Sequence, residues 1–515
     1  MKRIYTFLLA GLLVLSLSLV GFAADNDTLV IGTTDRVTEL SPANSYDNYS
    51  WHVLRSISDA LLKIKPKTNE VAPALAREWE VGPNAQVYTF HLVEGATFTD
   101  GEPVNAEAVK WSLERALRLD GPKGGVGLIK MIDKIETPDN STVKITLDKP
   151  NATFLIRMTG QIAASLIWSP KSTPENDFAR GDLTGVGPYK LKDFTPDQSV
   201  VLEAYDDYYG ENAKTKTIIE VKYTQSAQLR SAIEAGDVDV AFRTLNPVDI
   251  KQLEENPDLE TQSPEVLPSV RYMLFNVTDS TFKNERVRKA ISYAVERETI
   301  VDQVFSGLAA PIYTMVPSPW SGSIDTFPEK DLEKAQSLLE KEGYTEDNPL
   351  EATLWFSPKH YGTTEADVAA VLQGSMNELP NVDIGVQSLE WGAYSARMGE
   401  GGFGMFLLGW YPDYLEASNF LQPWTTGSPE VLGTFFNHHP NYEAYERILD
   451  TALSTPNPDN RAALYEAVQI LSAQDVMWIP LWSNLAQGYV ISKPNVKNAF
   501  CDSTMDIRSW LMYKE

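Results

Sequence analysis

Segments typical of β-strands alternate with segments typical of helices along almost the whole chain. β-branched and aromatic residues mark strand-like segments at 28–32, 87–92, 142–147, 199–204, 270–275 and 405–409. Apolar residues at helical spacing, with capping residues such as Asn105, predict helices over 106–119, 227–235, 284–295, 298–305, 330–342, 365–378 and 460–473. This alternation predicts an α/β fold.

The chain is too long to fold around one hydrophobic core. It has 515 residues, of which 43% are hydrophobic, so two or more well-packed domains are expected. Pro264 and Pro268 interrupt the pattern just before the strand-like segment 270–275, and a second break falls near 480–482. These two breaks are candidate crossings of the chain between two lobes.

The N-terminus has the layout of a secretory signal peptide. Lys2 and Arg3 precede an uncharged, almost wholly apolar run over 4–20, and small residues follow it. We expect cleavage after Ala23, with residues 1–23 as the signal peptide. The alternative is an uncleaved membrane anchor, for which the apolar run is short. The sequence therefore predicts an exported protein.

Charge and cysteine content exclude several classes of function. The formal net charge is −26 and there is no long basic run, which argues against binding to nucleic acid or to anionic membranes. Cys501 is the only cysteine, so no intramolecular disulfide, cysteine-based metal cluster or lipid-modified N-terminal cysteine is expected. The five histidines are scattered. No metal and no cofactor are predicted.

Signatures of catalysis are mostly missing from the sequence. There is no GxSxG, HExxH or GxxxxGK[ST] motif. Gly399, Gly401 and Gly404 fit GxGxxG formally, but a dinucleotide site needs a strand before the glycines and a helix after them. Here a helix-like segment precedes the glycines and the strand-like segment 405–409 follows, so we interpret them as a loop.

The stretch LLGWYPDYLEASNFLQPW, residues 407–424, places an acid among many aromatic rings. Asp413 follows Trp410, Tyr411 and Pro412, just past a strand-like segment that reads as buried. A carboxylate in an aromatic shell pairs strongly with a cation, because the local dielectric constant is low. An amine on a small solute is one natural partner. The other interpretation is a carboxylate that caps or turns the chain after Pro412, with the rings in the core.

Several sequence blocks, in order, resemble the ABC-transporter solute-binding proteins of family 5, the receptors for dipeptides and oligopeptides. They cover essentially the whole chain after the signal peptide and are PALA with Trp79 (73–79), YTFHLVEGATFTDGEPVNAEAVKWSLERA (88–116), GVGPYKL (185–191), YDDYYG (205–210), IEAGDVDVAF (233–242), RVRKAISYAVERETIVDQVFSG (286–307) and WYPDY (410–414).

The resemblance implies a two-lobed α/β clamshell of the periplasmic-binding-protein type II, with mixed sheets flanked by helices and an extra subdomain. We expect lobe 1 over 24–268 plus 484–515, with the subdomain over about 60–184, and lobe 2 over 269–483. The solute lies between the lobes, and closure about a hinge buries it. The implied partners are the transmembrane permease subunits of an importer, and the implied oligomeric state is a monomer.

The resemblance also implies the binding residues. The acid at Asp413 pairs with the α-amino group of a peptide. Dipeptide receptors hold the peptide carboxylate with an arginine before a helix of lobe 2, but the matching segment 357–364 has none, so a lysine or histidine has to replace it. The candidate ligand-binding residues are Asp413, Trp410, Tyr411, Tyr414, Lys359, His360, Asn48, Tyr49 and Tyr46.

The leading hypothesis is a periplasmic receptor without catalytic activity that captures oligopeptides or related amine-bearing solutes. A second hypothesis keeps the receptor and replaces the peptide with an oligosaccharide stacked on some of the 12 tryptophans. A remote third is an exported hydrolase that uses two of the 70 acidic residues as general acid and base.

Overall fold

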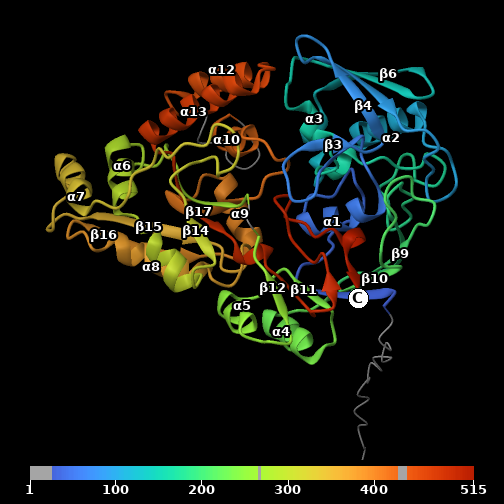
Figure 1. The fold of residues 1–515 in the computed structure, drawn as a ribbon. Coiled ribbons are helices and arrows are strands. Elements are labelled where there is room, and N and C mark those ends of the chain that lie inside the picture. Colours follow the sequence, from blue (N-terminus) through green and yellow to red (C-terminus); the bar gives the residue numbers. More distant parts are fainter. Residues whose placement is uncertain (1–25, 265–267, 427–437) are drawn as a thin grey trace, which may run out of the picture.

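The computed structural model describes residues 26–264, 268–426 and 438–515 (Figure 1). The predicted signal peptide, 1–23, lies outside the described residues. Within the described part of the chain, no helix is long and apolar enough to cross a membrane.

A seven-stranded sheet is built from both ends of the chain. Its central strand β1 (Thr28–Thr33) runs parallel to β10 (Thr217–Lys222) on one side and to β11 (Val240–Phe242) on the other. The remaining strands are antiparallel to their neighbours and complete the order β12-β19-β11-β1-β10-β9-β8, with bounds Glu260–Gln262 (β12), Val490–Ser492 (β19), Ser199–Ala204 (β9) and Tyr189–Thr195 (β8). We call this sheet and the elements around it the seven-stranded unit.

A six-stranded mixed sheet is built only from the middle of the chain. Its strands, in the order β14-β18-β13-β17-β15-β16, are Ala309–Pro311, Trp478–Asn484, Val270–Phe275, Met405–Trp410, Leu350–Phe356 and Val382–Ser388. All residues of β13 and β18 are buried, which explains their nearly continuous apolar sequences. We call this sheet and its flanking helices the six-stranded unit; the helices are α6 (Glu285–Ala294), α7 (Leu332–Lys341), α8 (Glu365–Met376) and α9 (Trp391–Gly399).

A four-stranded antiparallel sheet carries one long helix. Its order is β4-β5-β7-β6, with bounds Ala76–Val81, Val87–Leu92, Thr142–Leu147 and Ile132–Asp139. Helix α2 (Ala106–Leu119) packs on it through Val109, Leu113 and Ala116, and the predicted cap is confirmed because Asn105 Oδ1 accepts from the N–H of Ala108 at 2.9 Å.

The other described elements are shorter or lie at the borders of the three sheets. They are α1 (Asn48–Ile57), α3 (Phe154–Arg157), α4 (Ser226–Ala235), α5 (Pro247–Glu254), α10 (Ser418–Thr425), α12 (Tyr442–Leu453), α13 (Pro458–Asp475), β2 (Leu62–Ile64), β3 (Val71–Pro73), β20 (Val496–Lys497) and β21 (Tyr513–Lys514).

The units are in contact through their apolar cores. One buried cluster is continuous from the four-stranded sheet, for example Phe90, to the six-stranded sheet, for example Tyr272. A second cluster fills the seven-stranded unit, and Tyr411 packs against both clusters. In Figure 1 the blue-to-green half of the chain and the yellow-to-orange half lie side by side, with α12 and α13 at the upper border between them.

Several predicted helix bounds differ from the structure, and two of these differences have a local physical reason. Residues 298–305 form only a short π-helical turn, Ile300–Val304, because β-branched side chains at 299–301 disfavour a regular helix. Helix α13 begins two residues before the predicted position 460. Asn457 caps it at 2.9 Å to the N–H of Asn460, and Pro458 occupies its first position, where proline is well tolerated.

Candidate functional site

Strand β17 delivers Asp413 to the region where the units meet. The strand is buried up to Gly409 and ends at Trp410, after which Pro412 leads the chain out of the sheet. The carboxylate side chain remains 7% exposed. Asn419, on α10, holds this loop, because its Oδ1 accepts from the N–H of Asp413 at 2.7 Å and its Nδ2 donates to Oδ2 at 3.4 Å.

The electrostatic surroundings of Asp413 are unusual for a buried acid. Burial raises the pKa of its carboxyl group to about 6, and hydrogen bonds from Tyr46 and Asn419 with the more distant Arg157 cation limit the rise. Among the described residues, no basic side chain forms an ion pair with Asp413. The carboxylate of Asp413 is thus desolvated, and the described part of the chain supplies no ion-pair partner for it.

Tyr46 reaches Asp413 from the seven-stranded unit. It lies in the loop before α1, and its hydroxyl hydrogen-bonds the Asp413 carboxylate. The ring packs edge-on against Trp51 with 5.5 Å between centroids, while half of the residue's surface, 50%, stays exposed. The structure therefore brings Tyr46 and Asp413 together, two candidates from opposite units.

Arg157 makes a second contact to the same loop. Its Nη2 donates to the Tyr414 hydroxyl at 2.6 Å, its guanidinium lies 4.1 Å from the centre of that ring, and its Nη1 donates to the carbonyl of Leu128 at 2.9 Å. Tyr414 is fully buried, so its hydroxyl supports the loop that carries Asp413.

Trp410 and Tyr411, which precede Asp413 in the sequence, contact two different elements. Trp410 packs edge-on against Trp424 with 5.6 Å between centroids. The Tyr411 hydroxyl donates to Gln487 Oε1 at 2.5 Å, and Gln487 lies in the segment that leads from the six-stranded back to the seven-stranded sheet. Tyr411 therefore connects the loop of Asp413 with a chain crossing between units.

Lys359 and His360, the candidates for replacing the carboxylate-binding arginine of dipeptide receptors, lie in the loop after β15. Lys359 is exposed. His360 retains an exposed surface, but its ring stacks on Trp391 with 3.5 Å between centroids and an interplanar angle of 1°. Desolvation and, secondarily, the nearby Arg271 cation lower the pKa of His360 to about 4. At neutral pH His360 offers hydrogen bonds and no charge.

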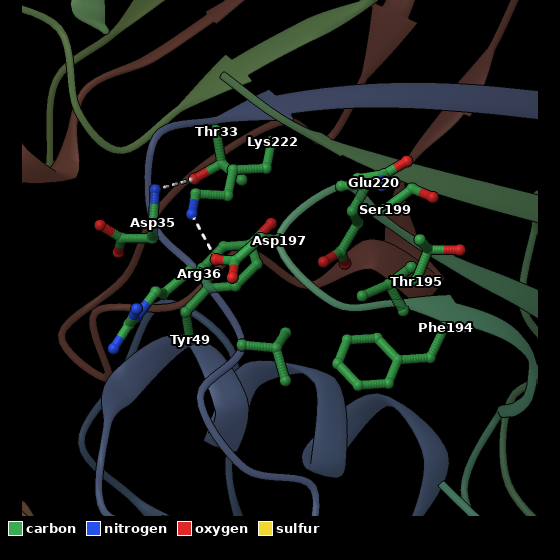
Figure 2. A pocket seen from close by; sticks show the side chains of 13 residues that line it. Thr33, Asp35, Arg36, Tyr49, Phe194, Thr195, Asp197, Ser199, Glu220 and Lys222 are labelled. Carbon is green, nitrogen blue, oxygen red and sulfur yellow. Dashed lines mark hydrogen bonds and ion pairs between the residues drawn. The ribbon is translucent and has the colours of Figure 1, made fainter. Parts of the chain in front are cut away.

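Asn48 and Tyr49 lie in the first turn of α1, and the contacts of Tyr49 are to groups other than Asp413. Tyr49 is buried against His52, with 5.2 Å between ring centroids, and borders a small cavity at the end of β1 (Figure 2). This cavity has a volume of about 20 Å³, the space of a single water molecule, and its lining includes Asp35, Phe194 and Glu220. Asn48 is the first residue of α1 and is partly buried.

A larger groove, of about 710 Å³, runs along the segment after β14. Its walls include Pro311, Tyr313, Trp320 and Leu485. The Trp320 ring packs on Phe420 of α10, with 5.3 Å between centroids, so one wall of the groove touches the helix that holds the Asp413 loop.

Arg271 is a charged residue of this region that the sequence analysis did not single out. It is the second residue of β13, is 4% exposed and forms an ion pair with Glu365, the first residue of α8. Its guanidinium carbon lies 3.8 Å from the centre of the Tyr361 ring. The available signal was one arginine inside the otherwise uncharged segment VRYMLF.

The chain passes from the seven-stranded to the six-stranded sheet between β12 and β13 and returns between β18 and β19. A buried acid without an ion-pair partner among the described residues lies where the two units meet. This arrangement is that of a two-lobed α/β binding protein. A family model described as bacterial extracellular solute-binding proteins, family 5 Middle, matches residues 70–430. The chain belongs to this family, and the resemblance noted from the sequence is confirmed.

Two curated relatives align with nearly the whole chain. Heme-binding protein A of Haemophilus influenzae is 27% identical over 508 residues, which cover 92% of this chain and 90% of that protein. The glutathione-binding protein GsiB of Escherichia coli (strain K12) is 30% identical over 478 residues, 89% of each chain.

Solved structures show the same fold. The periplasmic binding protein DppA of Helicobacter pylori, in complex with the peptide STSA, has a TM-score of 0.78 and 26% identity, with coverage of 95% of this chain and 98% of that chain. NikA of Brucella suis, in complex with Fe(III)-EDTA, has a TM-score of 0.85 at 21% identity, with coverage of 95% and 100%. The predicted fold class is therefore confirmed.

Proposed function

We propose that this receptor captures oligopeptides or related amine-bearing solutes between its lobes and delivers them to the permease of an ABC importer. It acts in the periplasm as a binding protein without catalytic activity. The binding proteins among its relatives support this role, as does the peptide in the DppA complex.

The observation that carries the proposal is the unpaired carboxylate of Asp413. An ammonium group of the solute supplies the positive partner that the described residues do not. Removal of one member of a buried ion pair typically costs about 3–5 kcal/mol, because the other charge is left desolvated. This corresponds to roughly two to four decades in affinity.

The proposed lobes follow the sheets. Lobe 1, 24–268 plus 484–515, contains the strands of the seven-stranded sheet, and lobe 2, 269–483, contains those of the six-stranded sheet except for Asn484, the last residue of β18. The subdomain over about 60–184 contains the four-stranded sheet. Tyr46 and Asp413 belong to different lobes, so their hydrogen bond crosses the proposed cleft.

The test is thermal unfolding of residues 24–515 against di- to pentapeptides, their N-acetylated forms, cello- and xylo-oligosaccharides, and nickel with histidine. A ligand at about 100 times its Kd adds roughly 2.7 kcal/mol to the free energy of unfolding, which is readily visible. We expect free-amine peptides to stabilise the protein, and both N-acetylation and Asp413→Asn to abolish the effect. Asp367→Asn, on the exposed face of α8, is the matched control.

The oligosaccharide receptor is the alternative outcome of this test. Stabilisation by sugars and not by peptides would overturn the peptide proposal and assign Trp410 a stacking role. Trp410 favours this alternative in one respect, because its indole Nε1 is buried without an acceptor among the described residues.

A further inference from the structure

We propose that the groove after β14 binds a basic side chain of the solute, a lysine or an arginine, so that the receptor favours peptides with a positive charge beyond their amino terminus. This inference rests on the proposed peptide-binding function and narrows the class of peptide.

One buried glutamine holds two parts of the groove lining in place. Gln469 of α13 is fully buried, and its Oε1 accepts from Thr314 Oγ1 at 2.7 Å and from the N–H of Val316 at 3.2 Å. Its Nε2 donates to the carbonyl of Gly322. Because Thr314 and Gly322 both line the groove, its shape is set before a solute binds, as is usual for ligand pockets.

The groove offers the surface that the stem of a long basic side chain needs. Pro311, Tyr313, Trp320 and Leu485 supply apolar and aromatic area to its walls. The volume of about 710 Å³ lies in the usual range for small-molecule pockets, about 300–1,000 Å³. The aliphatic stem of lysine or arginine packs on such a surface while the charged end stays near water.

An acid stands at the place where the charged end would lie. Among the described residues that line the groove, Asp325 is the only charged one. The N–H of Thr326 donates to the carbonyl of Tyr313 at 2.9 Å, which brings Asp325 back beside the aromatic wall. The Asp325 carboxylate is exposed and forms no ion pair within the described part of the chain. A cation of the solute therefore meets an acid without a competing protein partner.

The charges around Tyr313 also favour a cation. The Tyr313 hydroxyl donates to the carboxylate of Glu298, and burial, Glu298 and Glu329 raise the pKa of this hydroxyl. Arg297 acts in the opposite direction, since its buried guanidinium lies 4.5 Å from the centre of the ring. Asp325, Glu298 and Glu329 together outweigh this single positive charge, so the local potential attracts a basic group.

Helix α10 connects the groove with the loop of Asp413. The Trp320 ring packs on Phe420 with 5.3 Å between centroids, and the preceding residue, Asn419, accepts from the N–H of Asp413 at 2.7 Å. A peptide of about three to five residues, at about 3.5 Å per residue, covers such a distance. Leu485, on the other wall, packs against the core of the seven-stranded unit, so the groove borders the proposed cleft.

The experiment is calorimetric titration of residues 24–515 with tetraalanine, N-acetyl-tetraalanine and tetrapeptides in which lysine, norleucine or Nε-acetyl-lysine replaces the second, third or fourth alanine. Norleucine keeps the aliphatic stem of lysine and lacks its charge. At one position we expect norleucine to bind more tightly than alanine, and lysine about 2- to 5-fold more tightly than norleucine. Acetylation of the lysine should remove this gain, and high salt should reduce it, because the acid is exposed.

Two substitutions of Asp325 test the role of the acid. Asp325→Asn should abolish the gain of lysine over norleucine, and Asp325→Lys should make lysine bind more weakly than norleucine. Because the side chain is exposed, both variants are expected to fold. Asp367→Asn, which removes an exposed acid on α8, is the matched control and should leave the ratio of the two affinities unchanged.

Equal binding of the lysine and norleucine peptides at all three positions, or a gain that persists in Asp325→Asn, would overturn the inference. If tetraalanine then still binds and its N-acetyl form does not, the peptide receptor stands and only the role of the groove is wrong. If none of the peptides binds, both are wrong.

Discussion

The Tyr46 hydroxyl hydrogen-bonds the Asp413 carboxylate and so joins the loop before α1 to the loop after β17. The two loops belong to the seven-stranded and the six-stranded unit. This hydrogen bond satisfies part of the hydrogen-bonding capacity of the Asp413 carboxylate, but the neutral hydroxyl supplies no positive charge to balance it.

Tyr46→Phe should therefore weaken binding of amine-bearing peptides much less than Asp413→Asn does. The phenyl ring keeps the edge-on contact with Trp51, and only one neutral hydrogen bond is lost, which contributes about 0.5–1.5 kcal/mol. We expect a decrease in affinity of up to about tenfold by calorimetric titration. A loss as large as that in Asp413→Asn would mean that Tyr46 itself holds the solute.

Binding should depend on pH through Asp413. Because the pKa of this carboxyl group is raised to about 6, the group is mostly protonated below that pH and cannot pair with an ammonium. Peptide affinity should fall about tenfold per pH unit below 6 and level off above it. Titrations from pH 4.5 to 8 test this, and a flat profile would exclude pairing with the ionised acid.

The same shift has a consequence for the ligand-free protein. A raised pKa means that the folded state binds more protons than the unfolded state between about pH 4 and 6, so the contribution of Asp413 to stability falls as pH rises through this window. Asp413→Asn should therefore stabilise the ligand-free protein at pH 7, by on the order of 1–3 kcal/mol, and have little effect at pH 4. Urea unfolding at both pH values measures the difference.

His52 should stabilise the seven-stranded unit in a pH-dependent way. Burial alone would lower its pKa, but Asp506 and Glu220, the latter 2.8 Å from Nε2, outweigh burial and raise the pKa to about 10. The contribution is complete below the unfolded pKa of about 6.5 and is lost as pH rises toward 10. His52→Gln should lower Tm at pH 6 and reduce the loss of Tm between pH 7 and 10. Equal slopes in both proteins would contradict a charged His52.

Arg157 should favour the arrangement in which the units are in contact. Arg157→Met removes the hydrogen bonds to Tyr414 and to the carbonyl of Leu128 and keeps much of the apolar contact with the ring. We expect a larger radius of gyration for the ligand-free variant by small-angle X-ray scattering, and weaker peptide binding. Arg118→Met, whose charge is on the exposed side of α2, is the control.

Local sequence signals predicted the parts of the fold that depend on local chemistry. The Asn105 cap and the apolar face of 106–119 gave the bounds of α2, and Gly236 ends α4 in the left-handed conformation that glycine favours. The position of Asp413 just past a buried strand was also readable, because an apolar run that ends before a proline marks a strand end.

The contacts of the site depend on long-range packing that no single segment encodes. Arg271 and Glu365 form an ion pair but are 94 positions apart in the sequence. From the sequence alone, the arginine therefore looked like an interruption of a strand. Tyr46 and Tyr49 are close in sequence, but Asp47 caps α1 in extended conformation between them. Tyr46 thus lies before the helix near Asp413, and Tyr49 lies in its first turn beside the small cavity.

Strand β19, near the end of the chain, lies between β11 and β12 and pairs with both. Until residues 490–492 are in place, β11 and β12 have open edges, since each lacks the neighbour that joins them. A chain shortened by a few dozen residues at its C-terminus retains almost every strand but leaves these hydrogen-bonding edges exposed, as in proteins that pair edge to edge and aggregate. Pairing of β19 thus covers two strand edges at once, so that the integrity of this sheet depends on a segment close to the end of the sequence.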